Sequence, residues 1–183
     1  RIIMELLNLA RQAILMPVGI QDGDIEKIMN RLLSSSVDAA DIYFQSSHTE
    51  SWVMEGGIIK EGSHNIEQGA GVRAVLGEKT GFAYSDRIEL PALLEAANNV
   101  KAIVRQGQDA QVKLTNAANW PQYYPVANPL KSLADQHKID LLRKVESETR
   151  KLDSRIEEVI VSLSGVQESI LVANQDGSLA ADV

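Results

Sequence analysis

Cysteine is absent from this 183-residue sequence. Its absence excludes thiol catalysis, thiolate metal ligands and disulfides, and it agrees with a reducing compartment. No apolar run approaches the roughly 20 residues that a helix needs to cross a bilayer. The formal net charge is -7, and Lys and Arg do not cluster. A nucleic-acid surface, which needs clustered cations, is therefore not expected. A chain of this length buries about 70% of its unfolded surface, so it needs no disulfide or metal to fold.

Metal-binding motifs are missing as well. The three histidines are His48, His64 and His137. None begins an H-E-x-x-H motif, and none lies three or four residues from another histidine, the spacing that puts two ligands on one side of a helix. We therefore expect no zinc site built wholly from this chain. We also expect His48 and His64 to lie in or beside turns.

Catalytic side chains in other familiar arrangements are also lacking. Glu50 and Glu55 fall an odd number of residues apart on one predicted strand, so they face opposite sides and do not form a paired acid and base. No G-x-S-x-G motif, which would expose a nucleophilic serine, is present. We identify no catalytic and no metal-binding residue, and we assign no substrate-binding residue.

Two glycine-rich stretches invite comparison with nucleotide-binding loops. Residues 69–74 match G-x-G-x-x-A, but that motif must open a helix that faces a pyrophosphate, and residues 72–76 are strand-like. Residues 77–80 resemble the end of a P-loop, but Glu78 separates the glycine from the lysine. We interpret the first stretch as strand and the second as a hairpin turn.

What the sequence does contain is a run of strand-length segments between glycines. Residues 41–86 predict an antiparallel meander of five short strands. Gly56-Gly57 predicts a two-residue hairpin loop, because such a loop needs positive φ at both positions. Gly69 and Gly71 are expected to interrupt the next pair of strands. Residues 77–81 predict a further tight reversal.

Helical periodicity surrounds this meander. Residues 1–16 predict an amphipathic helix that ends at Pro17, and Glu5 and Arg11 within its apolar part argue against a signal peptide. Asp24 is expected to cap a second helix. Residues 90–106 predict the strongest helix, followed by Gly107. The apolar face of the second helix is predicted to consist of Ile25, Ile28, Leu32 and Leu33. That of the helix at 90–106 is predicted to consist of Leu93, Leu94, Ala97, Val100, Ile103 and Val104.

The second half begins with a Pro- and aromatic-rich connection over residues 108–130. Ser132 and Asp135 suggest a capping box for a helix that turns Ile139, Leu142 and Val145 inward. Its residues Lys138, Asp140, Arg143, Lys144 and Glu146 are predicted to face outward. Strands are predicted at 158–163, 170–173 and 178–183, with a turn at Asp176-Gly177. At an offset of 118 residues this half resembles the first, which suggests a structural repeat.

The predicted fold class is therefore α+β, an antiparallel meander sheet with helices packed on it and a helix–strand–hairpin unit repeated in the second half. We expect an N-terminal helix at 1–21, a helix, meander and covering helix at 22–107, an irregular connection at 108–130, and a second repeat-like unit at 131–183. The sequence ends within a predicted strand, so we expect it to be truncated at 183, a piece of a longer protein.

Residues 43–86, YFQSSHTESWVMEGGIIKEGSHNIEQGAGVRAVLGEKTGFAYSD, and residues 162–183, SLSGVQESILVANQDGSLAADV, resemble the N-terminal region of the TldD/PmbA family. The resemblance extends less tightly over the rest of the chain. It implies a cytoplasmic zinc metallopeptidase, in a family with the older name modulator of DNA gyrase. Such proteins degrade or process unfolded peptides, including modified precursor peptides, and pair with a PmbA (TldE)-like subunit as a heterodimer. A homodimer is the alternative.

The family's zinc motif, H-E-x-x-x-H with a later cysteine, lies in its C-terminal half and is absent from this sequence. No catalytic or metal-binding residue is therefore carried over, and we expect the chain to be inactive alone. The resemblance implies that this part supplies scaffold, dimer contacts and a wall of the substrate chamber. Residues 3–15 are the candidate subunit contact. The alternative is a non-catalytic protein-binding module that accepts a partner strand at a sheet edge.

Overall fold

The computed structural model of the chain describes residues 2–33, 37–104, 112–115 and 123–183. The chain divides into two compact units. Unit 1 consists of Arg1–Ser46, Gln68–Pro125 and Glu168–Val183, and unit 2 of Ser47–Glu67 and Val126–Gln167. The strands β1 (Ala39–Glu55), β2 (Ile58–Leu76) and β4 (Ile160–Asn174) contribute residues to both units.

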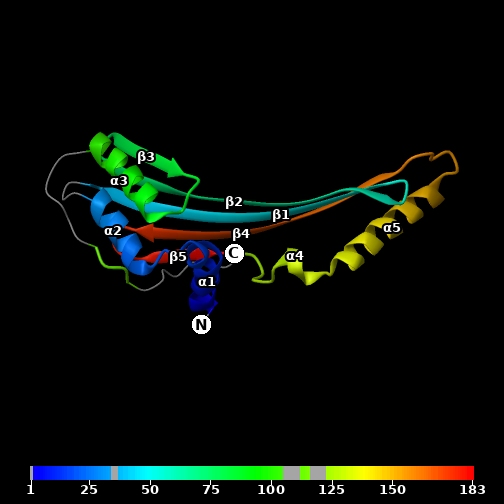
Figure 1. Cartoon of the computed structure of the whole chain (residues 1–183), viewed down its shortest axis with the longest axis horizontal. Coiled ribbons are helices and arrows are strands. Elements are labelled where there is room, and N and C mark those ends of the chain that lie inside the picture. The colour runs from blue at the N-terminus through cyan, green and yellow to red at the C-terminus, as the bar shows by residue number, and fades with distance from the viewer. Residues whose placement is uncertain (1, 34–36, 105–111, 116–122) are drawn as a thin grey trace. The chain divides into compact units, whose positions relative to one another are not determined.

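The strands form one five-stranded antiparallel sheet in the order β3-β2-β1-β4-β5 (Figure 1). β3 spans Lys79–Ser85 and β5 spans Leu179–Asp182. β2 pairs with β3 so that Val72 lies opposite Ala83, and β4 pairs with β5 so that Val172 lies opposite Ala180. Because β1, β2 and β3 are neighbours in chain order, the predicted antiparallel meander and the α+β class are confirmed.

The predicted number of strands in the meander was wrong, because residues 41–86 form two long strands and one short strand in place of five. β2 continues through Gly69 and Gly71 because aromatic rings of β3 lie over both glycines. A Cβ atom at Gly71 would lie 2.9 Å from the ring of Phe82, and one at Gly69 would meet the hydroxyl group of Tyr84. The rings therefore cover backbone that a glycine would otherwise expose.

Two of the predicted glycine turns, at Gly56-Gly57 and at Asp176-Gly177, show the positive φ that glycine allows. Gly56 and Gly57 join β1 to β2 with φ of 57° and 76°. Gly177, with φ of 83°, lies in the turn between β4 and β5, and its N–H donates to the carbonyl of Asn174 at 3.0 Å. β4 itself is one strand of 15 residues where two strands were predicted.

Three α-helices lie in the described part of unit 1. α1 (Ile2–Ala10) continues as a π-helical turn, η1 (Arg11–Leu15), and a 3₁₀ turn, η2 (Met16–Val18), before Gly19 ends it with a φ of 72°. α2 spans Asp22–Leu32 and α3 spans Leu90–Val104. The N-cap of α2 is Gln21 and not Asp24 as predicted. Asp24 instead accepts a hydrogen bond from the N–H of Gln21 at 3.1 Å.

The core of unit 1 lies between these helices and the sheet. α3 packs against β3 and α2, and α1 packs against β5. The predicted inward residues of α2 are buried, as are those of α3 except two: Leu94 is partly buried, and Ile103 is 52% exposed. Among the described residues, no single helix is long and apolar enough to cross a membrane. Ile3–Val18 and Asp22–Leu32, bent by 83° between them, reach the required length and hydropathy only when taken together.

The described residues of the predicted irregular connection have neither helix nor strand as far as Asn128, and a short helix begins at Pro129. At 112–115 its backbone N–H groups bond to unit 1: Val112 donates to Asn30 Oδ1 at 2.6 Å, Leu114 to Glu26 Oε1 at 3.0 Å, and Thr115 to the carbonyl of Gly177 at 2.6 Å. Of its aromatic residues, Trp120 lies outside the described residues.

Unit 2 carries α4 (Pro129–Ser132) and α5 (Asp135–Leu152). The predicted capping box of Ser132 and Asp135 does not form. The Ser132 hydroxyl donates to the carbonyl of Pro129 at 2.8 Å, and Ala134 is the N-cap of α5.

The orientation of α5 also differs from the prediction. Lys138, Leu142 and Glu146 are buried, whereas Val145 is 43% exposed. The two charged residues turn inward because each has a polar partner within unit 2. The predicted repeat and the predicted domain boundaries stay predictions.

Candidate functional site

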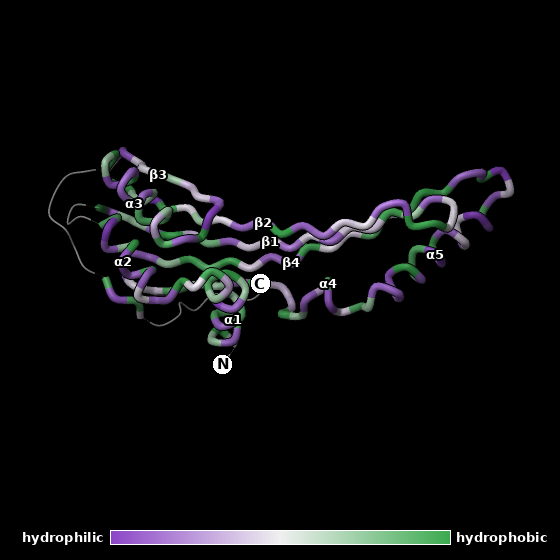
Figure 2. The backbone as a smooth tube through the Cα atoms, viewed as in Figure 1, coloured by the Kyte–Doolittle hydropathy of each residue, from purple (hydrophilic) through white to green (hydrophobic). Residues whose placement is uncertain are grey.

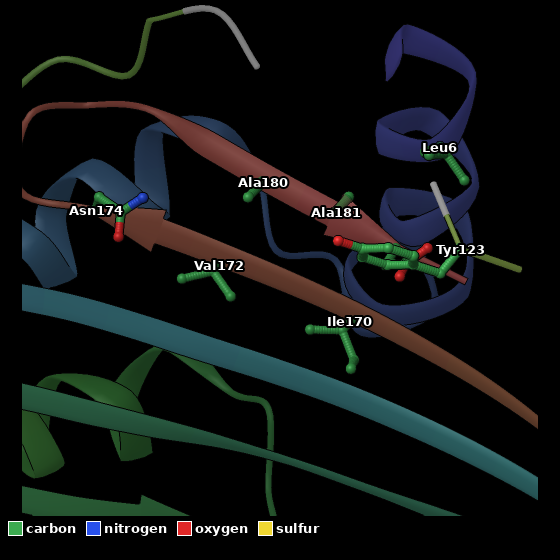
Figure 3. A pocket seen from close by; sticks show the side chains of 8 residues that line it. Leu6, Tyr123, Ile170, Val172, Asn174, Ala180 and Ala181 are labelled. Carbon is green, nitrogen blue, oxygen red and sulfur yellow. The ribbon is translucent and has the colours of Figure 1, made fainter. Parts of the chain in front are cut away.

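A pocket of about 500 Å³ opens in unit 1 beside the end of the sheet (Figure 3). Residues of α1, β4, β5 and the segment before Pro125 line it. Figure 3 shows Leu6 on α1 and the ring of Tyr123 across the lower end of α1 in this view. The lining residues are Leu6, Tyr123, Ile170, Val172, Asn174, Ala180, Ala181 and Asp182.

The pairing of β4 with β5 explains why these side chains gather. Side chains alternate along a strand, so Leu171, Ala173 and Leu179 enter the core and are at most 1% exposed. Ile170 lies opposite Asp182 and Val172 opposite Ala180 on the other side of the sheet. An apolar floor therefore lies next to β5, which is an edge strand.

The polar groups of the pocket are few, and those of Asn174 and Asp182 are already hydrogen-bonded. Asn174 donates from Nδ2 to the hydroxyl oxygen of Ser178 at 3.1 Å. Asp182 accepts the N–H of Val183 at 2.9 Å. None of the lining residues is a nucleophile next to a base. The pocket can bind an apolar side chain, but its residues offer no chemistry of their own.

Unit 2 contains a second cluster, around a buried ion pair that links α5 to β1. Lys138 Nζ lies 2.6 Å from Glu50 Oε1, with side chains that are 6% and 14% exposed. The same ammonium group donates to the carbonyl of Leu130 at 2.9 Å and to Asp135 at 3.2 Å. Glu50 also accepts the indole N–H of Trp52 at 2.5 Å.

Both members of this pair are held in their charged forms. The hydrogen bond from Lys138, followed by that from Trp52, lowers the pKa of Glu50 against the opposing effect of burial. The hydrogen bond to Glu50 raises the pKa of Lys138. A catalytic acid or base would need a pKa near the working pH, so this pair anchors α5 and is not an acid–base couple. The adjoining pocket is small, about 170 Å³.

The histidines lie differently from the prediction. His48 and His64 are in strands β1 and β2, not in turns, and their ring centroids are 6.2 Å apart at an interplanar angle of 62°. His137 is exposed near the start of α5. Within the ranges that the structure describes, no group of three or more His, Asp or Glu side chains is placed to hold a metal ion.

The nucleotide-loop motifs lie where the sequence analysis expected them. Residues 69–74 are within β2 and open no helix, and Gly77-Glu78 is the turn between β2 and β3. Sequence reasoning missed Lys138, which it placed outward, and the residues of the larger pocket. Both depend on partners far away in the chain, since Lys138 and Glu50 are 88 residues apart.

Two family models match the chain. The model described as PmbA/TldA metallopeptidase domain 1 matches residues 40–104. The model described as PmbA/TldA metallopeptidase central domain matches residues 128–183. Both units therefore contain residues of both matched regions.

Similar proteins carry related names. A metalloprotease TldD homolog of Haemophilus influenzae is 44% identical over 180 residues, which is 97% of this chain and 37% of that protein. Several solved structures share the fold, including the following two. A candidate modulator of DNA gyrase from Bacteroides thetaiotaomicron has a TM-score of 0.62 at 17% identity, covering 87% of this chain and 37% of its own. TldE from Thermococcus kodakarensis has a TM-score of 0.60 at 16% identity, covering 87% and 36%.

Proposed function

This chain belongs to the TldD/PmbA metallopeptidase family, and we propose that it forms the N-terminal part of a TldD-like zinc metallopeptidase. The observation that carries the proposal is the 44% identity to a TldD homolog along almost the whole chain. The chain spans 37% of the length of that relative, so most of such a protein would lie beyond these residues.

The proposed substrates are unfolded peptides, including modified precursor peptides. An extended peptide offers a backbone donor and acceptor at nearly every residue, and an edge strand such as β5 can bind these without regard to side chains. The apolar pocket beside β5 would then take a side chain of the bound peptide. This geometry equally supports the second candidate, a non-catalytic module that binds a protein strand at its sheet edge.

Zinc, which the family implies, does not fit the described residues. They contain no group of three or more His, Asp or Glu side chains placed to hold a metal ion, and the sequence has no cysteine. We therefore assign the zinc and the general base to a part of the longer protein outside this chain. The role left to this chain is scaffold, subunit contact and wall of the substrate chamber.

The proposed partner is a PmbA/TldE-like subunit, with a homodimer as the alternative. Support comes from the shared fold of TldE from Thermococcus kodakarensis. We also propose a cytoplasmic location, on the family resemblance alone. Neither a membrane nor nucleic acid is a proposed partner.

Zinc content tests this division of the protein. We expect the full-length protein to retain about one zinc per chain after dialysis, and residues 1–183 alone to retain none, because a structural or catalytic zinc site uses three or four protein ligands. Elemental analysis of both proteins at equal concentration gives the result. Stoichiometric zinc on residues 1–183 would overturn the assignment, as would its absence from the full-length protein.

A further inference from the structure

One side of β4 has no partner strand along most of its length. β4 has 15 residues, and β5 pairs with only four of them, Ile170–Ala173. Among the described strands, β5 alone lies on that side of β4. The backbone groups that Ile160–Ser169 direct to that side therefore meet no strand of the described residues. Figure 1 shows β4 continuing past the end of β5.

Two hydrogen bonds at the end of β4 show which backbone groups point to that side. The N–H of Asn174 donates to the carbonyl of Ser178 at 3.0 Å, on the β5 side. The N–H of Gln175 donates to the carbonyl of Ala40 at 3.0 Å, on the β1 side. Because N–H groups alternate in direction along a strand, every even-numbered residue of β4 presents its N–H and C=O to the β5 side. Over Ile160–Glu168 these groups form an open sheet edge.

Burial along β4 changes at the place where β5 stops. In Ser169–Asn174 every residue is buried or partly buried. In Ile160–Glu168 every second residue is exposed, and Ile160 and Val166 among them are 64% and 55% exposed. The alternation is unbroken from one stretch to the other, so no bulge interrupts this strand. Figure 2 shows hydrophobic residues continuing along β4 past the stretch that pairs with β5.

The open stretch lacks the features that keep an edge strand from pairing. Lysine and proline, which natural edges use to block a further strand, are absent from Ile160–Ser169. β-branched residues at positions 160, 161 and 166 favour strand pairing instead. By comparison β3, which lies at the other edge of the sheet, begins with Lys79. The open stretch therefore has the composition of a strand that is paired on both sides.

The direction of β5 indicates which strand fits this edge. β5 runs antiparallel to β4 and ends with Asp182 opposite Ile170. Continued in the same direction, Val183 would lie opposite Ser169 and the next residue opposite Glu168. A segment that continues the same chain without a turn has almost no loop to close. Its pairing with β4 therefore costs less entropy than the binding of a separate peptide or a second copy.

We propose that the about nine residues following Val183 extend β5 along the open edge of β4, in the register that Ile170 and Asp182 begin. Such an extension is roughly 30 Å long. The inference rests on the proposed function in one respect, that this chain is the N-terminal part of a longer protein, and it spans 37% of the TldD homolog of Haemophilus influenzae. The extended β5 is then the edge strand that the proposed function offers to a peptide.

Amide hydrogen exchange of β4, followed by NMR, tests the pairing. The measurement compares residues 1–183 with the proposed full-length protein. The N–H groups of Ser164, Val166 and Glu168 face the open edge, so they should exchange about 100-fold more slowly in the full-length protein. The N–H groups of Gly165 and Gln167 face β1 and are the matched control, and their exchange should change little.

A replacement variant separates the proposed strand from any other cover of the edge. In the full-length protein, the segment that follows Val183 is replaced by an equal length of alternating glycine and asparagine, both of which strands disfavour. Exchange of the three edge-facing amides should then return to the rate seen in residues 1–183. The two control amides should stay protected, which shows that β4 is still folded in the variant.

Three results would overturn the proposal. One is equal exchange of the edge-facing amides in residues 1–183 and in the full-length protein. Another is slow exchange that persists in the replacement variant, because another part of the protein would then cover the edge. The third is slow exchange that appears only after a PmbA-like subunit or an unstructured peptide is added, because that molecule would then be the occupant. None of these measurements requires peptidase activity, so failure here is distinguishable from failure of the proposed function.

Discussion

Gly56 and Gly57 adopt backbone conformations that are strained for any residue with a side chain. Both have positive φ, and a Cβ atom at Gly57 would lie 3.4 Å from Glu146 Oε2, an ordinary contact. The cost of a side chain at Gly57 therefore comes from the backbone and not from crowding.

Gly57→Ala should lower the free energy of unfolding by about 1–2 kcal/mol, the cost of a left-handed conformation for an alanine. Gly23→Ala is the matched control. Gly23 lies in α2 without positive φ and with open space around it, so alanine should stabilise by up to about 1 kcal/mol. Urea titration measures both. Equal effects of the two substitutions would show that φ at Gly57 is not what constrains the residue.

Individual glycines show which local structures could be predicted from the sequence and which could not. The turn at Gly56-Gly57 depends on two adjacent residues, so it was predicted correctly. Gly69 and Gly71 carried the same local signal, yet β2 continues through them because Tyr84 and Phe82 cover them. That cover comes from another strand, and no local pattern contains it.

At the scale of elements, the buried pair of Glu50 and Lys138 fixes α5 to β1. Lys138→Met should lower the free energy of unfolding by about 3 kcal/mol, because it leaves the Glu50 carboxylate buried with a single donor, the indole of Trp52. The control is Lys151→Met on the same helix. Lys151 pairs with Glu148 at the surface, where such pairs contribute about 0–1 kcal/mol.

The same pair predicts a pH dependence. The folded pKa of Glu50 lies below the ordinary value of 4.5 for a glutamate. The stabilisation from Glu50 is therefore complete above pH 4.5 and is lost as the pH falls through the lower folded pKa. The folded pKa of Lys138 lies above 10.5, so its stabilisation holds below that pH and is lost only at more alkaline pH. The gap in unfolding free energy between wild type and Glu50→Gln should thus stay constant from pH 6 to 9 and narrow below about pH 4.5. A gap that persists unchanged at pH 3 would contradict this.

The orientation of α5 could not have been predicted from its own sequence. Periodicity assigned Val145 inward and Lys138 and Glu146 outward, and the structure reverses all three. Burial of the charges depends on Glu50, 88 residues away from Lys138, and on Arg150, four residues from Glu146. His48 and His64 are close for a similar reason, since neighbouring strands bring them together.

At the scale of the whole molecule, the sheet order β3-β2-β1-β4-β5 joins the two halves of the sequence. The meander was predictable because β1, β2 and β3 follow one another with glycine turns between. The return of β4 to the side of β1 was not, because it pairs segments more than a hundred residues apart. The larger pocket depends on β4, β5 and α1 together, so the sequence analysis assigned none of its residues.

The family match relates this chain to the proposed function. Residues matching domain 1 and the central domain of the family are present, and within the described residues no metal-binding cluster is found. The proposed function assigns a supporting role to this chain and the catalytic role to a part of the longer protein outside it. Its central claim is that this chain serves peptide cleavage without performing it.

Cleavage of an unstructured peptide tests that claim most directly. Three proteins would be compared with added zinc, each with and without a PmbA-like subunit. They are residues 1–183, the proposed full-length protein, and that full-length protein with the first histidine of the H-E-x-x-x-H motif implied by the family resemblance changed to alanine. The account predicts that only the intact full-length protein cleaves the peptide, as mass spectrometry of the products would show. Cleavage by residues 1–183 alone, at a rate comparable to the full-length protein, would contradict it.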